Sequence, residues 1–233
     1  MMKFVHVAVT VLGLLSLGHS APVTSCENLI QPREIHGNQL VGKWTQIAES
    51  TGIPQFKVLT KMPLETAWMN ITAANEANTF NNLYVHKMMG MCSTLKTNMT
   101  LVNNSMVHNY QYSAVLLNTG CPDCLVIYSN NTVGRTTVKA LHLLSRRVKV
   151  SAAELEEFTK QAECLNLESP AIMDSEKGFC PDPALTPGTK TIDLTVSNIT
   201  PDDLNLLEKL FTESGMKTIL DTDQSSVDLF KED

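Results

Sequence analysis

Short apolar segments alternate with clusters of Asn, Gly and Pro from Gly42 to Leu144, and the even spacing favours an antiparallel β-barrel or sandwich. No long helical pattern interrupts these segments, which excludes a parallel sheet built from βαβ units. The pattern therefore predicts a mostly β domain. The predicted strands are 42–50, 58–73, 79–89, 91–102, 105–110, 111–118, 124–129 and 135–144.

A change to helical spacing follows the last predicted strand. Ser151 and Glu154 form a capping-box signature, and Leu155, Phe158, Thr159 and Ala162 then recur on one face. We expect this helix to pack on the outside of the β domain. Three prolines between 181 and 187 mark a boundary, after which residues 200–215 predict a second short helix, and the last residues have a disordered composition.

The N-terminus has the features of a cleavable secretory leader. Residues 4–17 are nearly all apolar, Lys3 precedes them, and Gly18 and Ser20 suit the positions around a signal-peptidase site. We place the cut after Ser20 and expect no membrane insertion, because no later segment is apolar for long enough to span a bilayer. The net charge of −6, without a block of Lys or Arg, argues against nucleic acid as a partner.

Cysteines and glycosylation sequons support a secretory route. An even set of six cysteines in a secreted chain predicts a disulfide framework, although counting alone leaves 15 pairings open. The acceptor asparagines of the five Asn-x-Ser/Thr sequons are Asn70, Asn98, Asn103, Asn130 and Asn198.

Two motifs at the ends of the β region resemble the lipocalin family. Gly42-Lys43-Trp44 opens the first long strand, and Leu143-Leu144-Ser145-Arg146 ends the last one. The resemblance implies an eight-stranded antiparallel up-and-down barrel with one flanking α-helix, in which Arg146 covers the buried indole of Trp44 and closes one end. A surface position for Arg146 is the plainer alternative. The segment from Cys26 to Trp44 is similar to the lipocalin subgroup of alpha-1-acid glycoprotein and the toxin-binding plasma lipocalins of fish.

The same resemblance implies a disulfide pairing. Cys26 would bond Cys164 and Cys92 would bond Cys180, which leaves Cys121 and Cys124 for each other. The chain departs from the family between the sixth and seventh strands. Lipocalins commonly carry Thr-Asp-Tyr and a second Tyr there, whereas this chain has Thr119-Gly120-Cys121-Pro122-Asp123-Cys124.

Strand alternation predicts which side chains line the barrel, because a glycan on Asn98 and the charges of Lys87, Lys96 and Lys139 must face outward. On the first strand, an inward Trp44 would carry Gln46 and Ala48 inward with it. The predicted ligand-binding residues are Gln46, Tyr84, His86, Met88, Met91, Leu95, Met99 and His142. Core filling is the plainer interpretation of each Met, and a structural or surface role is that of each His.

A soft, Met-rich lining suits varied lipophilic guests. Fish members of the subgroup bind tributyltin, saxitoxin and tetrodotoxin. The two histidines predicted to face inward suit an organotin. The guanidinium toxins would need inward carboxylates, and strand alternation predicts none.

We therefore expect a secreted, glycosylated, monomeric carrier of lipophilic or xenobiotic molecules, with no catalytic activity, cofactor or metal. Its predicted parts are a leader at 1–20, a lipocalin domain at 21–181 and an extension at 182–233. Redox catalysis by Cys121-Pro-Asp-Cys124 is a weak rival, because thiol oxidoreductases place such a motif at a helix N-terminus. A second rival is an immune-modulating or inhibitory protein that acts through its glycosylated surface or its extension.

Overall fold

The computed structural model describes residues 25–51, 64–88, 90–108, 112–133, 136–185 and 190–193. The predicted leader, the second helix at 200–215 and the sequon at Asn198 lie outside these residues. No helix of the described part is long and apolar enough to cross a membrane.

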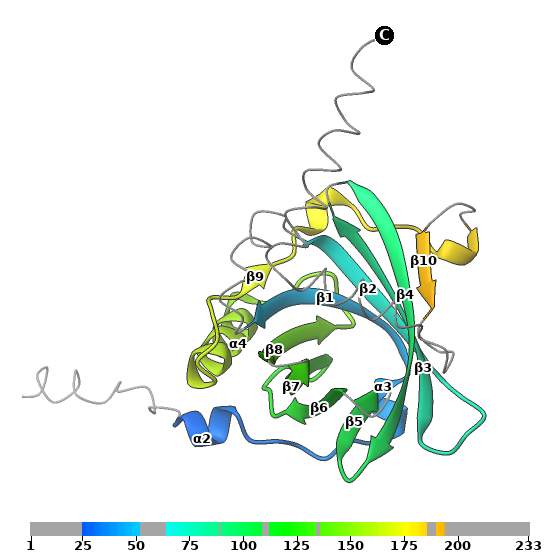
Figure 1. Cartoon of the computed structure of the whole chain (residues 1–233). Coiled ribbons are helices and arrows are strands. Elements are labelled where there is room, and N and C mark those ends of the chain that lie inside the picture. The colour runs from blue at the N-terminus through cyan, green and yellow to red at the C-terminus, as the bar shows by residue number, and fades with distance from the viewer. Residues whose placement is uncertain are drawn as a thin grey trace, which may run out of the picture.

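Eight antiparallel strands close into a barrel. Each strand pairs with its neighbour in the chain, β1 pairs with β8, and the links β1–β2 and β4–β5 are part of the same ring. Figure 1 shows the strands arranged around a common axis. Their bounds are β1 Gly42–Thr51, β2 Leu64–Ala73, β3 Thr79–Met88, β4 Met91–Val102, β5 Ser105–His108, β6 Tyr112–Leu117, β7 Cys124–Val133 and β8 Thr136–Ser145.

The predicted strands are confirmed in number and order, with β4 matching at both ends. The prediction for β7, 124–129, ended too early, because its ladder with β8 continues through residues 130–133, of which Asn130, Asn131 and Thr132 are polar. The predicted boundary between β5 and β6 falls at residues 109–111, which lie outside the described part of the chain, and β6 ends at Leu117, one residue before its predicted end.

A β-bulge in β1 corrects the predicted inward position of Ala48. The register with β8 shifts between Gln46 and Ala48, so that Ile47 and Ala48 both pack on the outer face. A bulge inserts one extra residue and reverses the phase of the residues that follow it. Glu49 therefore takes the inward position that alternation assigned to Ala48.

One end of the barrel is closed by Trp44 and Arg146, as the family resemblance implied. The guanidinium of Arg146 lies 3.5 Å from the centre of the Trp44 ring and donates hydrogen bonds to the carbonyls of Gln39, Val41 and Lys43. The Trp44 indole N–H donates to the carbonyl of Leu40, at the end of the short helix α3 (Gly37–Leu40). A cation over an indole contributes about 0.5–2 kcal/mol.

Gly42 is required at this end by conformation and space. Its φ is +107°, which residues with a side chain rarely adopt, and a Cβ there would lie 2.8 Å from Nη1 of Arg146. The glycine of the Gly-x-Trp motif thus makes room for the arginine that covers the tryptophan.

Helix α4 (Ala152–Cys164) packs against the outside of the barrel, as predicted, near β1 and β8 in Figure 1. Its buried residues Phe158 and Ala162 contact an outer apolar cluster that includes Ile47, Ala48 and Leu143. The predicted capping box is present: Ser151 Oγ accepts from the Glu154 amide, and Glu154 accepts from the Ser151 amide.

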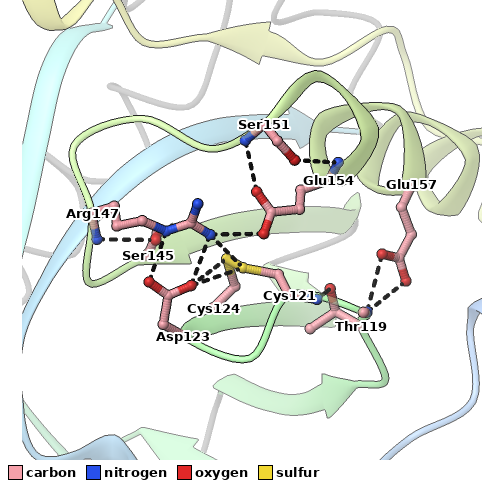
Figure 2. Close-up of polar contacts among 10 residues, drawn as sticks. Thr119, Cys121, Asp123, Cys124, Ser145, Arg147, Ser151, Glu154 and Glu157 are labelled. Carbon is pink, nitrogen blue, oxygen red and sulfur yellow. Dashed lines mark hydrogen bonds and ion pairs between the residues drawn. A yellow bond between two sulfur atoms is a disulfide. The ribbon is translucent and has the colours of Figure 1, made fainter.

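Arg147 joins the start of α4 to the connection between β6 and β7 (Figure 2). Its guanidinium donates to both carboxylate oxygens of Asp123, at 2.7 and 2.8 Å, and to Glu154 at 2.8 Å. Glu157 of α4 accepts from the amide of Gly120 in the same connection. The hydrogen bond from Arg147 is the main reason that the pKa of Glu154 falls to about 2.

Three disulfides match the pairing that the family resemblance implied. Cys26–Cys164 ties the short helix α2 (Cys26–Leu29) to the end of α4, and Cys92–Cys180 ties β4 to the segment after α4. Cys121–Cys124 closes the connection that replaces the tyrosine motif of the family. This motif lies between two strands and not at a helix N-terminus.

The segment after α4 runs back along the barrel and contacts β1, β2 and β4. β9 (Ala171–Ile172) pairs antiparallel with β1, and the Trp68 indole N–H on the outer face of β2 donates to the Cys180 carbonyl. Further along, β10 (Lys190–Asp193) pairs in parallel with β4, beside which it lies in Figure 1. Sequence analysis did not predict β9 or β10.

The sequon asparagines on the strands alternate with interior residues, so their side chains point outward as predicted. Asn70 lies between the interior residues Met69 and Ile71, and Asn98 precedes the interior Met99. Asn130 is exposed on β7, and Asn103 is exposed in the β4–β5 turn with a φ of 47°.

Candidate ligand-binding site

The barrel interior has a packed half next to the closed end. Trp44, Leu40, Phe80 and Leu144 belong to one buried apolar cluster there. Met99, predicted as a ligand-binding residue, is also part of this cluster and is 3% exposed. Its position supports the plainer interpretation, that it fills the core.

Polar side chains from three strands meet in the other half of the interior. The Tyr84 hydroxyl donates to Gln46 Oε1 at 3.0 Å, and Gln46 Nε2 donates to Glu49 Oε2 at 2.8 Å. Nδ1 of His142 lies 3.9 Å from the same Glu49 oxygen. Tyr84, Gln46, Glu49 and His142 thus form a continuous polar chain, hereafter the interior polar chain.

Water reaches this chain although it faces inward. The side chains of Glu49 and His142 are 28% and 27% exposed, whereas Gln46 is 2% exposed. The interior is therefore not packed solid at this height. A carboxylate that faces such a space attracts a positively charged or hydrogen-bond-donating group.

Glu49 was missed by sequence analysis because strand alternation places it outside. The available signal was the adjacent apolar pair Ile47 and Ala48, which a regular strand with one face in the barrel would not place together on the outer side. The structure also overturns the inference that no carboxylate faces inward.

Burial sets the protonation of the titratable groups beside Glu49. It raises the pKa of Tyr84 far above its usual range, and the Glu49 charge adds to that increase. It lowers the pKa of His142, and here Glu49 acts in the opposite direction by favouring the imidazolium. Tyr84 is consequently a hydrogen-bond donor near neutral pH, and His142 is mainly a neutral imidazole.

His86 lies next to the interior polar chain on β3. Its ring stacks on Tyr84 with centroids 5.4 Å apart, and its Nε2 lies 2.8 Å from Ser93 Oγ. Burial lowers the pKa of His86. Its Nδ1 is buried, and within the described part of the chain it has no hydrogen-bond partner. The imidazole thus has one nitrogen whose hydrogen-bonding capacity is not met by the described residues.

The remaining predicted residues lie toward the β3–β4 hairpin. Leu95 is paired with Tyr84 across the two strands and is half-buried. Met88 is paired with Met91 next to the hairpin turn, where Met91 is 56% exposed. The structure therefore brings Gln46, Tyr84, His86, Leu95 and His142 together, but it does not bring Met91 or Met99 into the same group.

A cluster with metal-ligand chemistry occurs elsewhere in the described part of the chain. Cys121, Asp123 and Cys124 have their ligand atoms within 4.8 Å of one another. Because the two sulfurs are bonded in a disulfide, this cluster has no free thiolate to offer a metal.

Comparison with known proteins supports the fold. No family model and no curated protein matches this chain. Among solved structures it is similar to the siderocalin Ex-FABP, a protein that functions through dual ligand specificities. The TM-score is 0.55 at 17% identity, over 62% of this chain and 99% of that one. Together with the closed barrel and its flanking helix, this likeness shows a lipocalin-like fold.

Proposed function

We propose that the protein is a secreted carrier that binds small lipophilic molecules in the open half of its barrel. The observation that carries the proposal is the interior polar chain, which water reaches above a packed and closed end. An apolar guest would gain about 25 cal/mol for each Å² of surface buried, and the polar chain would orient its head group. A lipocalin-like barrel supports small-molecule binding in general.

Glu49 specifies the class of guest that fits best: an apolar body with one positively charged or hydrogen-bond-donating group. The predicted absence of an inward carboxylate was the argument against guanidinium ligands, and Glu49 removes it. An organotin remains compatible with the imidazoles of His86 and His142. Guanidinium toxins and an organotin are both ligands of the toxin-binding lipocalins that the sequence resembles.

Three further features support carriage in an extracellular fluid. The three disulfides are typical of an oxidising compartment, and the sequons at Asn70, Asn98, Asn103 and Asn130 have outward phase or lie in an exposed turn. The N-terminal segment has the pattern of a secretory leader. We include glycosylation, a monomeric state and lack of catalytic activity in the proposal.

A matched panel of ligands tests it. Dodecylamine, dodecanol and dodecanoate share one apolar chain and differ in the charge of the head group, so competition with a fluorescent lipophilic probe isolates the contribution of Glu49. We expect the amine to bind about tenfold more tightly than the carboxylate, which corresponds to about 1.4 kcal/mol. The Glu49→Gln variant should lose most of this preference while it keeps its affinity for the alcohol.

Glu163→Gln is the control, because it removes the same charge from an exposed position on α4. It should leave the preference unchanged. If no member of a broad lipophilic panel binds the unmodified protein, the carrier proposal is wrong. If the alcohol binds but Glu49→Gln does not change the preference, only the role of Glu49 is wrong.

A further inference from the structure

The wall of the barrel is built differently along one edge of β4. Its other edge pairs with β3 from Met91 to Thr100. On this edge, the described residues of β5 pair with residues 100–102, and β10 pairs with Ser93–Lys96. Two strands from distant parts of the chain thus share one edge of β4 at different heights.

β10 is joined to this edge by a short pairing and by a nearby covalent tether. A four-residue parallel pairing is weak by itself, because parallel ladders are slightly less stable than antiparallel ones and short strand pairs are marginal in water. The Cys92–Cys180 disulfide fixes the chain next to the start of β4, only ten residues before Lys190. Such a short connection raises the effective concentration of β10 at its edge, so that it can detach and return without leaving the molecule.

The edge that β10 covers lies next to the candidate site. Ser93 and Leu95 share the inward phase of the interior residue Met99, and Ser93 contacts His86. The pairing Ile192↔Leu95 places the middle of β10 level with Leu95, whose partner across β3 is Tyr84. Detachment of β10 would expose the edge of the wall at the height of the guest.

We propose that β10 is a displaceable latch: it completes the side wall of the barrel along Ser93–Lys96, and its detachment opens a lateral route between solvent and the open half of the interior. The route matters for carriage only if the proposed function is correct. The mechanical claim does not depend on it. A partner that captured β10, or cleavage between Cys180 and Lys190, would release cargo without unfolding the barrel.

Thiol labelling tests the latch in the full-length chain without any ligand. Leu95→Cys places a reporter thiol inside the barrel, and its reaction rate with an aqueous thiol reagent measures access. In this background, Thr191→Pro with Ile192→Pro removes two successive amides, of which one points toward β4. Thr191→Val with Ile192→Val keeps both amides and β-branched side chains, and is the matched control.

We expect the proline pair to increase the labelling rate about tenfold or more, because detachment of β10 then requires less free energy. The valine pair should leave the rate unchanged. Equal rates in all three proteins would overturn the proposal. Hydrogen exchange on the unmodified protein provides a second test that requires no variant to fold: alternate amides of Ser93–Lys96 on the β10 side should be protected. If they exchange as fast as unprotected amides, β10 is not docked and the latch is rejected.

The outcome for the latch is separable from that for the carrier. If the lipophilic panel finds no ligand while the proline pair still accelerates labelling, the latch stands and the carrier proposal falls. If ligands leave the proline and valine variants at the same rate although the proline pair accelerates labelling, cargo does not use the lateral route, and the role of the latch in release is wrong.

Discussion

Single residues at the closed end of the barrel are fixed by backbone geometry as much as by side-chain chemistry. We expect Gly42→Ala to lower the free energy of unfolding by about 2–4 kcal/mol, because the new Cβ is strained at positive φ and displaces Arg146 from its carbonyl acceptors. Urea unfolding measures the change. Gly90→Ala is the control, since its φ is also positive but its Cβ would meet no atom within 4 Å. It should cost about 1–2 kcal/mol. Equal losses in the two variants would contradict this account.

Glu154 gives a second prediction at the residue scale. Arg147 and the capping box hold the pKa of Glu154 at about 2 in the folded protein, below its value in the unfolded chain. The contribution of ionised Glu154 to the free energy of unfolding is therefore complete above about pH 4.5 and is lost as the pH falls toward 2. Glu154→Gln should flatten the pH dependence of stability within this window. Glu156→Gln, two residues further along α4 at a carboxylate that pairs with Lys160, should flatten this pH dependence less. Unfolding midpoints measured from pH 2 to pH 5 provide the comparison.

Elements are held in place by crosslinks of very different loop length. Cys26–Cys164 spans 138 residues, whereas Cys121–Cys124 spans 3. On the chain-entropy model, the first contributes about 5 kcal/mol and the second about 2 kcal/mol. Replacing both cysteines of the long crosslink by serine should thus lower the thermal midpoint much more than the same change at the short one. A larger loss at Cys121–Cys124 would mean that this disulfide stabilises the native connection itself, beside Arg147.

The elements also show what the sequence could and could not reveal. Strand bounds such as 91–102 were predictable, because alternation and turn residues are local signals. The capping box at Ser151 was predictable for the same reason. The bulge at Ile47 was missed, since its one local signal is the adjacent apolar pair Ile47 and Ala48, while the extra residue leaves the apolar content of β1 unchanged and reverses only its phase. β10 follows three prolines and pairs with residues 97 positions earlier in the chain, and no local pattern encodes that contact.

At the scale of the whole molecule, the barrel is divided into a packed half and an open half that holds the titratable groups. The bulge creates this division in β1: Trp44 lies in the closed-end core, while Glu49 faces the open half. Tyr84, His86 and His142 have the inward phase that alternation predicts, because their strands are regular at these positions. Glu49, the charged residue of the interior polar chain, was missed because β1 is not regular. The charge of the interior, and hence the class of its guest, thus depends on a backbone irregularity.

The open half should give the whole protein a pH dependence near neutrality. Burial lowers the pKa of His142 below its usual value of 6.5, so the unfolded chain binds a proton more readily than the folded one. The contribution of His142 to the free energy of unfolding is complete above pH 6.5 and declines as the pH falls below this value. The groups that face His142 set how steeply the free energy of unfolding falls with pH. Glu49 raises the pKa of His142 and moderates the fall, whereas Tyr84 is neutral in this range and His86 has a lowered pKa of its own.

His142→Gln should therefore reduce the fall in the free energy of unfolding between pH 6.5 and 5, and Glu49→Gln should make it steeper. His36→Gln, at a surface histidine that is 57% exposed, should leave the slope unchanged. Urea midpoints across this range measure all four proteins, and slopes for His142→Gln and Glu49→Gln that change in the same direction would contradict the opposed roles of burial and charge in the interior.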